Sequence, residues 1–138
     1  MVANSERQPA AALRVLVVED DADTARTWVW LLEAMGHQVE VARDGPAALQ
    51  AAEANRPDAV LLDLGLPGLS GYEVAQQLRQ QQTGAARPLI IAVTGLGEYT
   101  QRLRSYEVGI DLHLVKPVNP EELKGFLNRY QNAYHPGR

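Results

Sequence analysis

Short apolar runs alternate along the chain with segments in which apolar residues recur every three or four positions. The apolar runs are continuous and rich in β-branched residues, which is typical of strands buried on both faces of a parallel sheet. The other segments have the period of amphipathic helices. The predicted strands cover residues 13–18, 38–42, 59–62, 89–93 and 112–115, and the predicted helices cover residues 24–35, 46–54, 72–82, 98–107 and 120–130.

The first predicted helix carries a buried stripe and an exposed aromatic side chain. Trp30 lies about 200° around the helix from the stripe residue Trp28 and is expected to be exposed. Asp23 is the expected N-cap and Gly36 the expected C-terminal stop. The stripe, at positions i, i+3, i+4 and i+7, is Trp28, Leu31, Leu32 and Met35.

Strict alternation of five strands with five helices predicts one α/β domain, a parallel sheet with helices on both faces and right-handed crossovers. A chain of 138 residues suits a single domain with a sizeable core. The domain is expected over residues 13–131, between a polar leader over 1–12 and a polar tail over 132–138. The leader mixes acidic and basic residues and is not interpreted as a signal peptide, so a cytoplasmic location is expected.

Composition narrows the classes of function. A formal net charge of −4 disfavours nucleic acid as a direct partner, because phosphate binding needs a basic face. The chain has no cysteine, which excludes disulfides, thiolate catalysis and cysteine zinc sites. No apolar run approaches the length of a membrane span, so no membrane partner is expected. The three histidines show no metal-ligand spacing, and His37 is expected to be structural.

Chemically useful residues stand at the carboxyl ends of four of the five predicted strands. In an open α/β sheet these ends meet at one edge, where ligands bind. Adjacent carboxylates repel one another unless a cation neutralises them, and an all-oxygen site suits Mg²⁺. One carboxylate can then attack phosphorus while a lysine and a hydroxyl hold the other phosphoryl oxygens. The residues are Glu19, Asp20 and Asp21 after the first strand, Asp63 at the third, Thr94 at the fourth and Lys116 at the fifth.

Four pieces of the chain together resemble the receiver domain of two-component response regulators. They are VLVVEDD, DAVLLDLGLPGLSGYEVAQQLR, LIIAVTG and GIDLHLVKPVNPEEL, and the match extends over residues 13–130. The resemblance implies a doubly wound, flavodoxin-like fold with strand order 2-1-3-4-5, and Mg²⁺ as cofactor. It also implies a phosphohistidine partner, either a histidine kinase or a histidine phosphotransfer domain, and allows a dimer. The domain would catalyse only its own phosphorylation and dephosphorylation.

Carried over position by position, the resemblance assigns roles to the residues at the sheet edge. Asp63 would be the phospho-acceptor, Thr94 the switch hydroxyl and Lys116 the phosphate-binding lysine. The Lys116–Pro117 bond is expected to be cis. The implied metal ligands are Glu19 (largely through water), Asp20, Asp63 and the backbone carbonyl of Gly65.

Two departures from the family pattern affect its finer properties. His113 stands three residues before Lys116, where the family commonly has Tyr or Phe, which puts the usual aromatic switch in question. Gly65 and Leu96 lack polar side chains at positions that help to place the water that hydrolyses the acyl phosphate. A long-lived phosphoryl group on Asp63 is therefore expected.

Two other functions compete with this interpretation. The stretch DADT, from Asp21 to Thr24, resembles the D-x-D-x-T pattern of haloacid-dehalogenase-type phosphatases, in which Asp21 would be the nucleophile. That assignment leaves Asp63 unexplained. The second alternative is a receiver-like module that is never phosphorylated and acts by binding alone. In the receiver interpretation Asp21 is a solvated neighbour or a helix cap and not a ligand.

Overall fold

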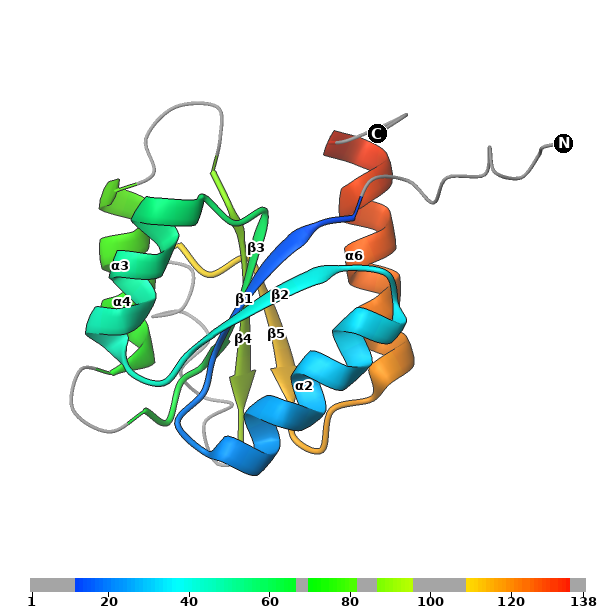
Figure 1. Cartoon of the computed structure of the whole chain (residues 1–138), viewed down its shortest axis with the longest axis horizontal. Helices are drawn as coiled ribbons and strands as arrows, with labels where there is room; N and C mark the ends of the chain where they lie inside the picture. The colour runs from blue at the N-terminus through cyan, green and yellow to red at the C-terminus, as the bar shows by residue number, and fades with distance from the viewer. Residues whose placement is uncertain (1–11, 67–69, 82–86, 96–108, 135–138) are drawn as a thin grey trace, which may run out of the picture.

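The computed structural model describes residues 12–66, 70–81, 87–95 and 109–134 (Figure 1). Its strands form one five-stranded parallel sheet in the order β2-β1-β3-β4-β5, which confirms the predicted topology. The strands are β1 (Arg14–Val18), β2 (Gln38–Ala42), β3 (Ala59–Asp63), β4 (Leu89–Thr94) and β5 (Leu112–Val115). The helices are α2 (Ala22–Ala34), α3 (Gly45–Asn55), α4 (Gly71–Gln81) and α6 (Pro120–Tyr134). The expected helix over 98–107 lies outside the described residues.

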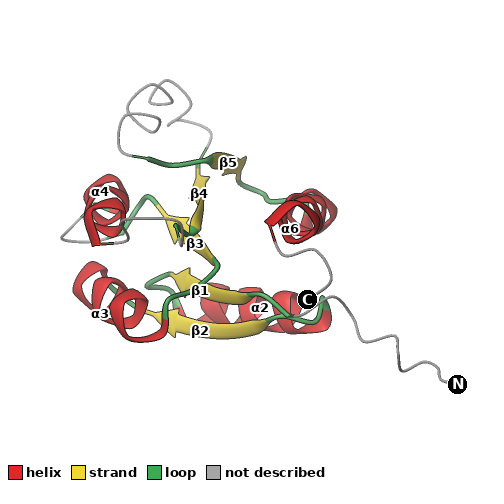
Figure 2. Ribbon diagram, turned by 90° about the horizontal axis from the view of Figure 1, so that it is seen from above, coloured by secondary structure: helices red, strands yellow, loops and turns green. Residues whose placement is uncertain are grey.

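The sheet separates two apolar cores, one on each face. Figure 2 shows α3 and α4 on one face and α2 and α6 on the other. Successive strand side chains point to opposite faces, so Leu16 of β1 packs with the first pair of helices and Val17 with the second. All five residues of β3 are buried, as expected of the central strand. None of the described helices is long and apolar enough to cross a bilayer.

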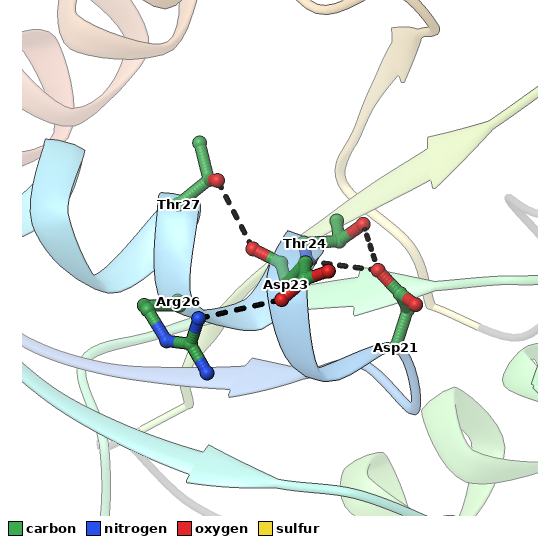
Figure 3. Close-up of polar contacts among 5 residues, drawn as sticks. All are labelled: Asp21, Asp23, Thr24, Arg26 and Thr27. Atoms are coloured by element: carbon green, nitrogen blue, oxygen red, sulfur yellow. Dashed lines mark hydrogen bonds and ion pairs between the residues drawn. The ribbon is translucent and has the colours of Figure 1, made fainter.

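Helix α2 begins two residues earlier than the sequence pattern predicts, and its N-cap is Asp21, not Asp23 (Figure 3). The Asp21 carboxylate accepts from the backbone N–H and the hydroxyl of Thr24, at 2.9 and 2.6 Å. Asp23 instead lies in the first turn, where it pairs with Arg26 at 3.3 Å. Either aspartate could cap a helix by its residue type. The backbone after β1 is extended at Asp21, so the helix begins there and Asp21 is the cap.

Three further expectations about α2 and its surroundings are confirmed. Gly36 adopts a left-handed conformation, with φ +96°, directly after the helix end. Trp28 is buried, whereas the side chain of Trp30 is 73% exposed. His37 is buried, and its Nδ1 accepts the backbone N–H of Leu13 at 3.2 Å, which fits a structural role.

Helix α6 continues to Tyr134, four residues beyond the predicted end. Leu123 and Leu127 are buried, and Gln131, one turn further on, is buried as well. Because Gln131 is polar, a search for apolar residues at helical spacing ends at Leu127 and misses the last part of the buried stripe. The buried face therefore reaches Gln131, the predicted end of the domain, and the helix itself continues through residues 132–134, which the sequence pattern assigns to a polar tail.

Candidate functional site

The register of the strands brings the chemically useful residues to one edge of the sheet. Val18 pairs with Leu62, so the next residues along β1 and β3, Glu19 and Asp63, lie side by side. On the far side, the backbone N–H of Lys116 donates to the carbonyl of Thr94 at 2.8 Å. The predicted meeting of these strand ends is therefore present in the structure.

Three carboxylates form the centre of the site. Glu19, Asp20 and Asp63 each place one oxygen within 4.8 Å of the others. Glu19 and Asp63 are buried and Asp20 is exposed. Burial, with the negative charge of Asp63 as a lesser cause, raises the pKa of Glu19 to about 7, although the backbone N–H of Asp21 and the charge of Lys116 oppose the shift. Three carboxylates that are close together and partly buried repel one another, and a hard divalent cation with oxygen ligands would neutralise them.

Two contacts hold the same carboxylate oxygen of Asp63. Its Oδ1 accepts the backbone N–H of Gly65 at 2.9 Å, which fixes the rotation of the carboxyl group. The Nζ of Lys116 lies 3.8 Å from the same oxygen. Thr94, at the end of the neighbouring strand, is buried beside β3 and β5. A carboxylate, an ammonium group and a hydroxyl are thus gathered at the strand ends, as the sequence predicts.

The start of α4 packs directly against the residues that follow β3. Ser70 and Glu73 form a capping box, in which the Glu73 N–H donates to the Ser70 hydroxyl and the Ser70 N–H donates to the Glu73 carboxylate, at 3.3 and 3.0 Å. A Cβ at Gly71 would lie 2.9 Å from the carbonyl oxygen of Asp63. The sequence signal for this helix start is the S-x-x-E pattern from Ser70 to Glu73.

The other residues predicted from the sequence lie outside the carboxylate cluster or are not tested by the structure. Asp21 caps α2 and is not part of the carboxylate cluster found among the described residues. The Lys116–Pro117 bond is cis, as expected. His113 is half-buried on β5. The carbonyl of Gly65 as a metal ligand stays a prediction, and Leu96 lies outside the described residues. Sequence reasoning missed Arg43, which contacts the backbone of Asp20.

Comparison with known proteins agrees with this geometry. Residues 15–128 match the Response regulator receiver domain family. Response regulator MprA of Mycobacterium sp. (strain KMS) is 40% identical over 111 residues, which are 80% of this chain and 47% of that protein. The alkaline phosphatase synthesis transcriptional regulatory protein PhoP of Bacillus subtilis is 36% identical over 124 residues, 87% of this chain and 50% of its own length. The chain thus spans about half the length of these curated relatives.

Solved structures give the same result. The receiver domain of sensor histidine kinase PA1611 from Pseudomonas aeruginosa, with a magnesium ion in its active-site cleft, superposes with a TM-score of 0.78. It is 33% identical, and the match covers 88% of this chain and 99% of that one. Chemotaxis protein CheY4 of Vibrio cholerae also gives 0.78, at 30% identity, over 87% of this chain and 99% of that one.

The chain belongs to the response regulator receiver domain family. It is a receiver domain of two-component signal transduction, and its acidic cluster is consistent with the phospho-aspartate site of that class. The phosphatase interpretation is wrong, because the family match, over residues 15–128, includes residues of all five strands, and Asp21 serves as a helix cap. Receiver domains are generally not classed as enzymes, and the family implies a histidine kinase as partner.

Proposed function

We propose that Asp63 accepts a phosphoryl group from the phosphohistidine of a histidine kinase or a histidine phosphotransfer domain, in a Mg²⁺-dependent reaction in the cytoplasm. The modified domain then changes conformation. The observation that carries this proposal is the position of the Asp63 carboxylate, which belongs to the acidic cluster with Glu19 and Asp20 and also lies 3.8 Å from Lys116 Nζ. Catalysis is limited to the domain's own phosphorylation and dephosphorylation.

The reaction needs a nucleophile, a leaving group and charge neutralisation. An oxygen of the Asp63 carboxylate attacks phosphorus, a P–O bond forms, and the P–N bond to the donor imidazole breaks. The electron pair of that bond stays on the imidazole nitrogen, and the product is an acyl phosphate. Lys116, 3.8 Å from Oδ1 before transfer, pairs with the phosphoryl oxygens afterwards. The Thr94 hydroxyl, at the neighbouring strand end, holds another of these oxygens.

The proposed cation is held by Glu19, Asp20, Asp63 and the backbone carbonyl of Gly65. When bound, Mg²⁺ supplies the positive charge that draws phosphoryl oxygens into an acidic site. Support comes from the all-oxygen cluster and from the Pseudomonas aeruginosa receiver domain, whose structure contains magnesium in the active-site cleft. Burial, the main cause of the raised pKa of Glu19, also favours a cation at this site, because the buried carboxylate has lost water that would stabilise its charge.

The partner is proposed to dock over α2 and the segment after β5. A groove of about 310 Å³ lies between them, mostly apolar and lined by Thr27 and Leu31 of α2 and by Pro117 on the opposite side. Lys116 also lines this groove, so the groove leads to Asp63. Trp30 is exposed on the same helix, one turn after Thr27. A helix that carries the phosphohistidine could pack here and present its imidazole to the site.

The central experiment is phosphorylation by acetyl phosphate, followed by intact mass spectrometry. With Mg²⁺ the domain should gain the mass of one phosphoryl group, and chelation of the metal should prevent the gain. Asp63→Asn should abolish it. Asp21→Asn is the matched control, because it changes a carboxylate two residues from Glu19 and asparagine also caps helices. A domain that never gains a phosphoryl group would support the binding-module alternative and contradict this proposal.

A further inference from the structure

Arg43 reaches from the end of β2 to the turn that carries the acidic cluster. Its Nε and Nη2 donate to the backbone carbonyl of Asp20 at 3.2 and 2.6 Å. The residue before it, Ala42, accepts the backbone N–H of Glu19 at 3.0 Å. Two consecutive residues at the end of β2 therefore hold two consecutive residues at the end of β1.

The three acids of the cluster differ in what fixes them. Asp63 is the last residue of β3 and is paired with Val93 of β4. Glu19 is buried and bonded to Ala42. Asp20 comes one residue later, is exposed, and lies in the turn between β1 and α2. Its side-chain direction therefore depends on how the backbone of this turn is held.

The contact from Arg43 is well suited to hold that backbone. Two donors of one rigid guanidinium converge on one carbonyl oxygen, and charge-assisted hydrogen bonds of this kind are stronger than neutral ones. The N–H of the same peptide group, which belongs to Asp21, donates to Glu19 Oε2 at 3.1 Å. Both ends of the peptide between Asp20 and Asp21 are thus bonded, its carbonyl to Arg43 and its N–H to Glu19.

We propose that Arg43 is a positioning residue of the metal site, whose guanidinium holds the Asp20 backbone so that the Asp20 carboxylate faces those of Glu19 and Asp63. The inference rests on the proposed function only for the presence of a cation at this cluster. Arg43 touches neither the phosphoryl group nor the metal in this scheme. It acts through Asp20, as groups outside the ligand set commonly do.

Charge and positioning predict opposite effects of removing Arg43. A positive side chain close to a cation site repels the cation, so electrostatics alone predicts that Arg43→Gln tightens Mg²⁺ binding. Positioning predicts weaker binding, because Asp20 is no longer directed at the cluster. The sign of the change in affinity therefore distinguishes the two roles.

The experiment is a calorimetric titration of the whole chain with Mg²⁺ alone, with no phosphodonor. Arg43→Gln should weaken binding about tenfold, the lower end of what loss of a supporting group costs a metal site. Arg43→Lys keeps the charge but loses the paired donors, and should lie between Arg43→Gln and the unaltered chain. Arg26→Gln is the matched control, because Arg26 is an exposed arginine on α2 that pairs with Asp23 and not with the cluster. Its affinity should match that of the unaltered chain.

A second measurement separates positioning from general loss of structure. Urea unfolding in the presence of a chelator should show that Arg43→Lys is nearly as stable as the unaltered chain while it binds Mg²⁺ more weakly. If the unaltered chain binds Mg²⁺ and Arg43→Gln binds it equally or more tightly, the positioning role is wrong and the metal site stands. If the unaltered chain does not bind Mg²⁺, the metal site itself is wrong, and this inference fails with it.

Discussion

Replacement of Gly71 by alanine should destabilise the domain even though alanine is the better helix former. A Cβ at this position would lie 2.6 Å from Leu64 Cα, 2.8 Å from Leu64 Cδ2 and 2.9 Å from the carbonyl oxygen of Asp63. Carbon atoms in proteins normally pack at about 3.5–4.0 Å. Two of the three atoms belong to backbone, so the clash cannot be relieved by rotation of a side chain. Either α4 or the backbone after Asp63 must move.

The size of the effect follows from two opposing terms. Overpacking of a tight contact costs about 1–3 kcal/mol. Alanine in place of glycine returns about 1 kcal/mol or less at the first position of a helix. Because two of the three contacts are with backbone atoms, the overpacking cost lies in the upper part of its range, about 2–3 kcal/mol, and the free energy of unfolding of Gly71→Ala should fall by about 1–2 kcal/mol. Because Asp63 is displaced with its neighbour, phosphorylation by acetyl phosphate should also slow.

Urea unfolding in chelator, followed by tryptophan fluorescence, measures the first effect, since Trp28 is buried in the core. The matched control is Gly125→Ala in the middle of α6, where the new Cβ would lie 3.4 Å from Nη1 at the far end of the Arg129 side chain, an ordinary van der Waals contact. That variant should gain about 0.5–1 kcal/mol, because only the helix propensity changes. The reasoning fails if Gly71→Ala is as stable as the unaltered chain and is phosphorylated at the same rate.

Three further outcomes are expected. Burial lowers the pKa of His37 below its ordinary value of 6.5, so its contribution to stability is present above pH 6.5 and is lost as the pH falls through the lowered pKa. Urea titrations below this pH should show a steeper loss for the unaltered chain than for His37→Gln, and parallel curves would exclude this role. Gly65→Asn should shorten the lifetime of the phosphoryl group, because a Cβ there lies 3.5 Å from Asp63 Oδ1 and the amide can orient water, whereas slower loss would show that water access sets the lifetime. Trp30→Ala should weaken binding of the phosphodonor protein about tenfold or more, with Gln50→Ala on α3 unaffected, and equal affinities would place the docking surface elsewhere.

The strands could be predicted from the sequence because each one is marked by a short, continuous apolar run. The run before Asp63 is continuously apolar, and the structure buries all of it at the centre of the sheet. The position of the acids and of Lys116 then follows from topology, since parallel strands bring their carboxyl ends to one edge. A parallel sheet was therefore enough to predict that these residues share one edge, whereas the strand order was implied by the family resemblance.

The features that the sequence did not predict depend on contacts between distant residues. Arg43 and Asp20 are 23 positions apart, and nothing in the residues around Arg43 marks it as a partner of a backbone carbonyl. The predicted N-cap of α2, Asp23, was wrong because Asp21 is the same residue type two positions earlier, and either residue could cap a helix. Only the turn after β1 shows that Asp21 is the one that reaches Thr24.

The described contacts also connect Asp63 to the far end of the sheet by two routes. One route is α4, whose first residue, Gly71, packs on the Asp63 carbonyl. About 12 Å further along this helix, Arg79 donates to the carbonyls of Gly109 and Pro88, at 3.0 and 2.6 Å, and pairs with Asp111.

The other route is β5, which starts directly after Asp111 and is followed at its other end by Lys116, the residue that faces Asp63. Asp111 itself is bonded to both the N–H and the carbonyl of Ile90 at the start of β4. The helix and the strand thus meet at Arg79 and Asp111 and meet again at Asp63. Coupling between distant sites is carried by contiguous packed contacts of this kind. A phosphoryl group that draws Lys116 toward Asp63 would therefore act on β5 and α4 together, because neither can shift along its length without straining the contacts that Arg79 makes.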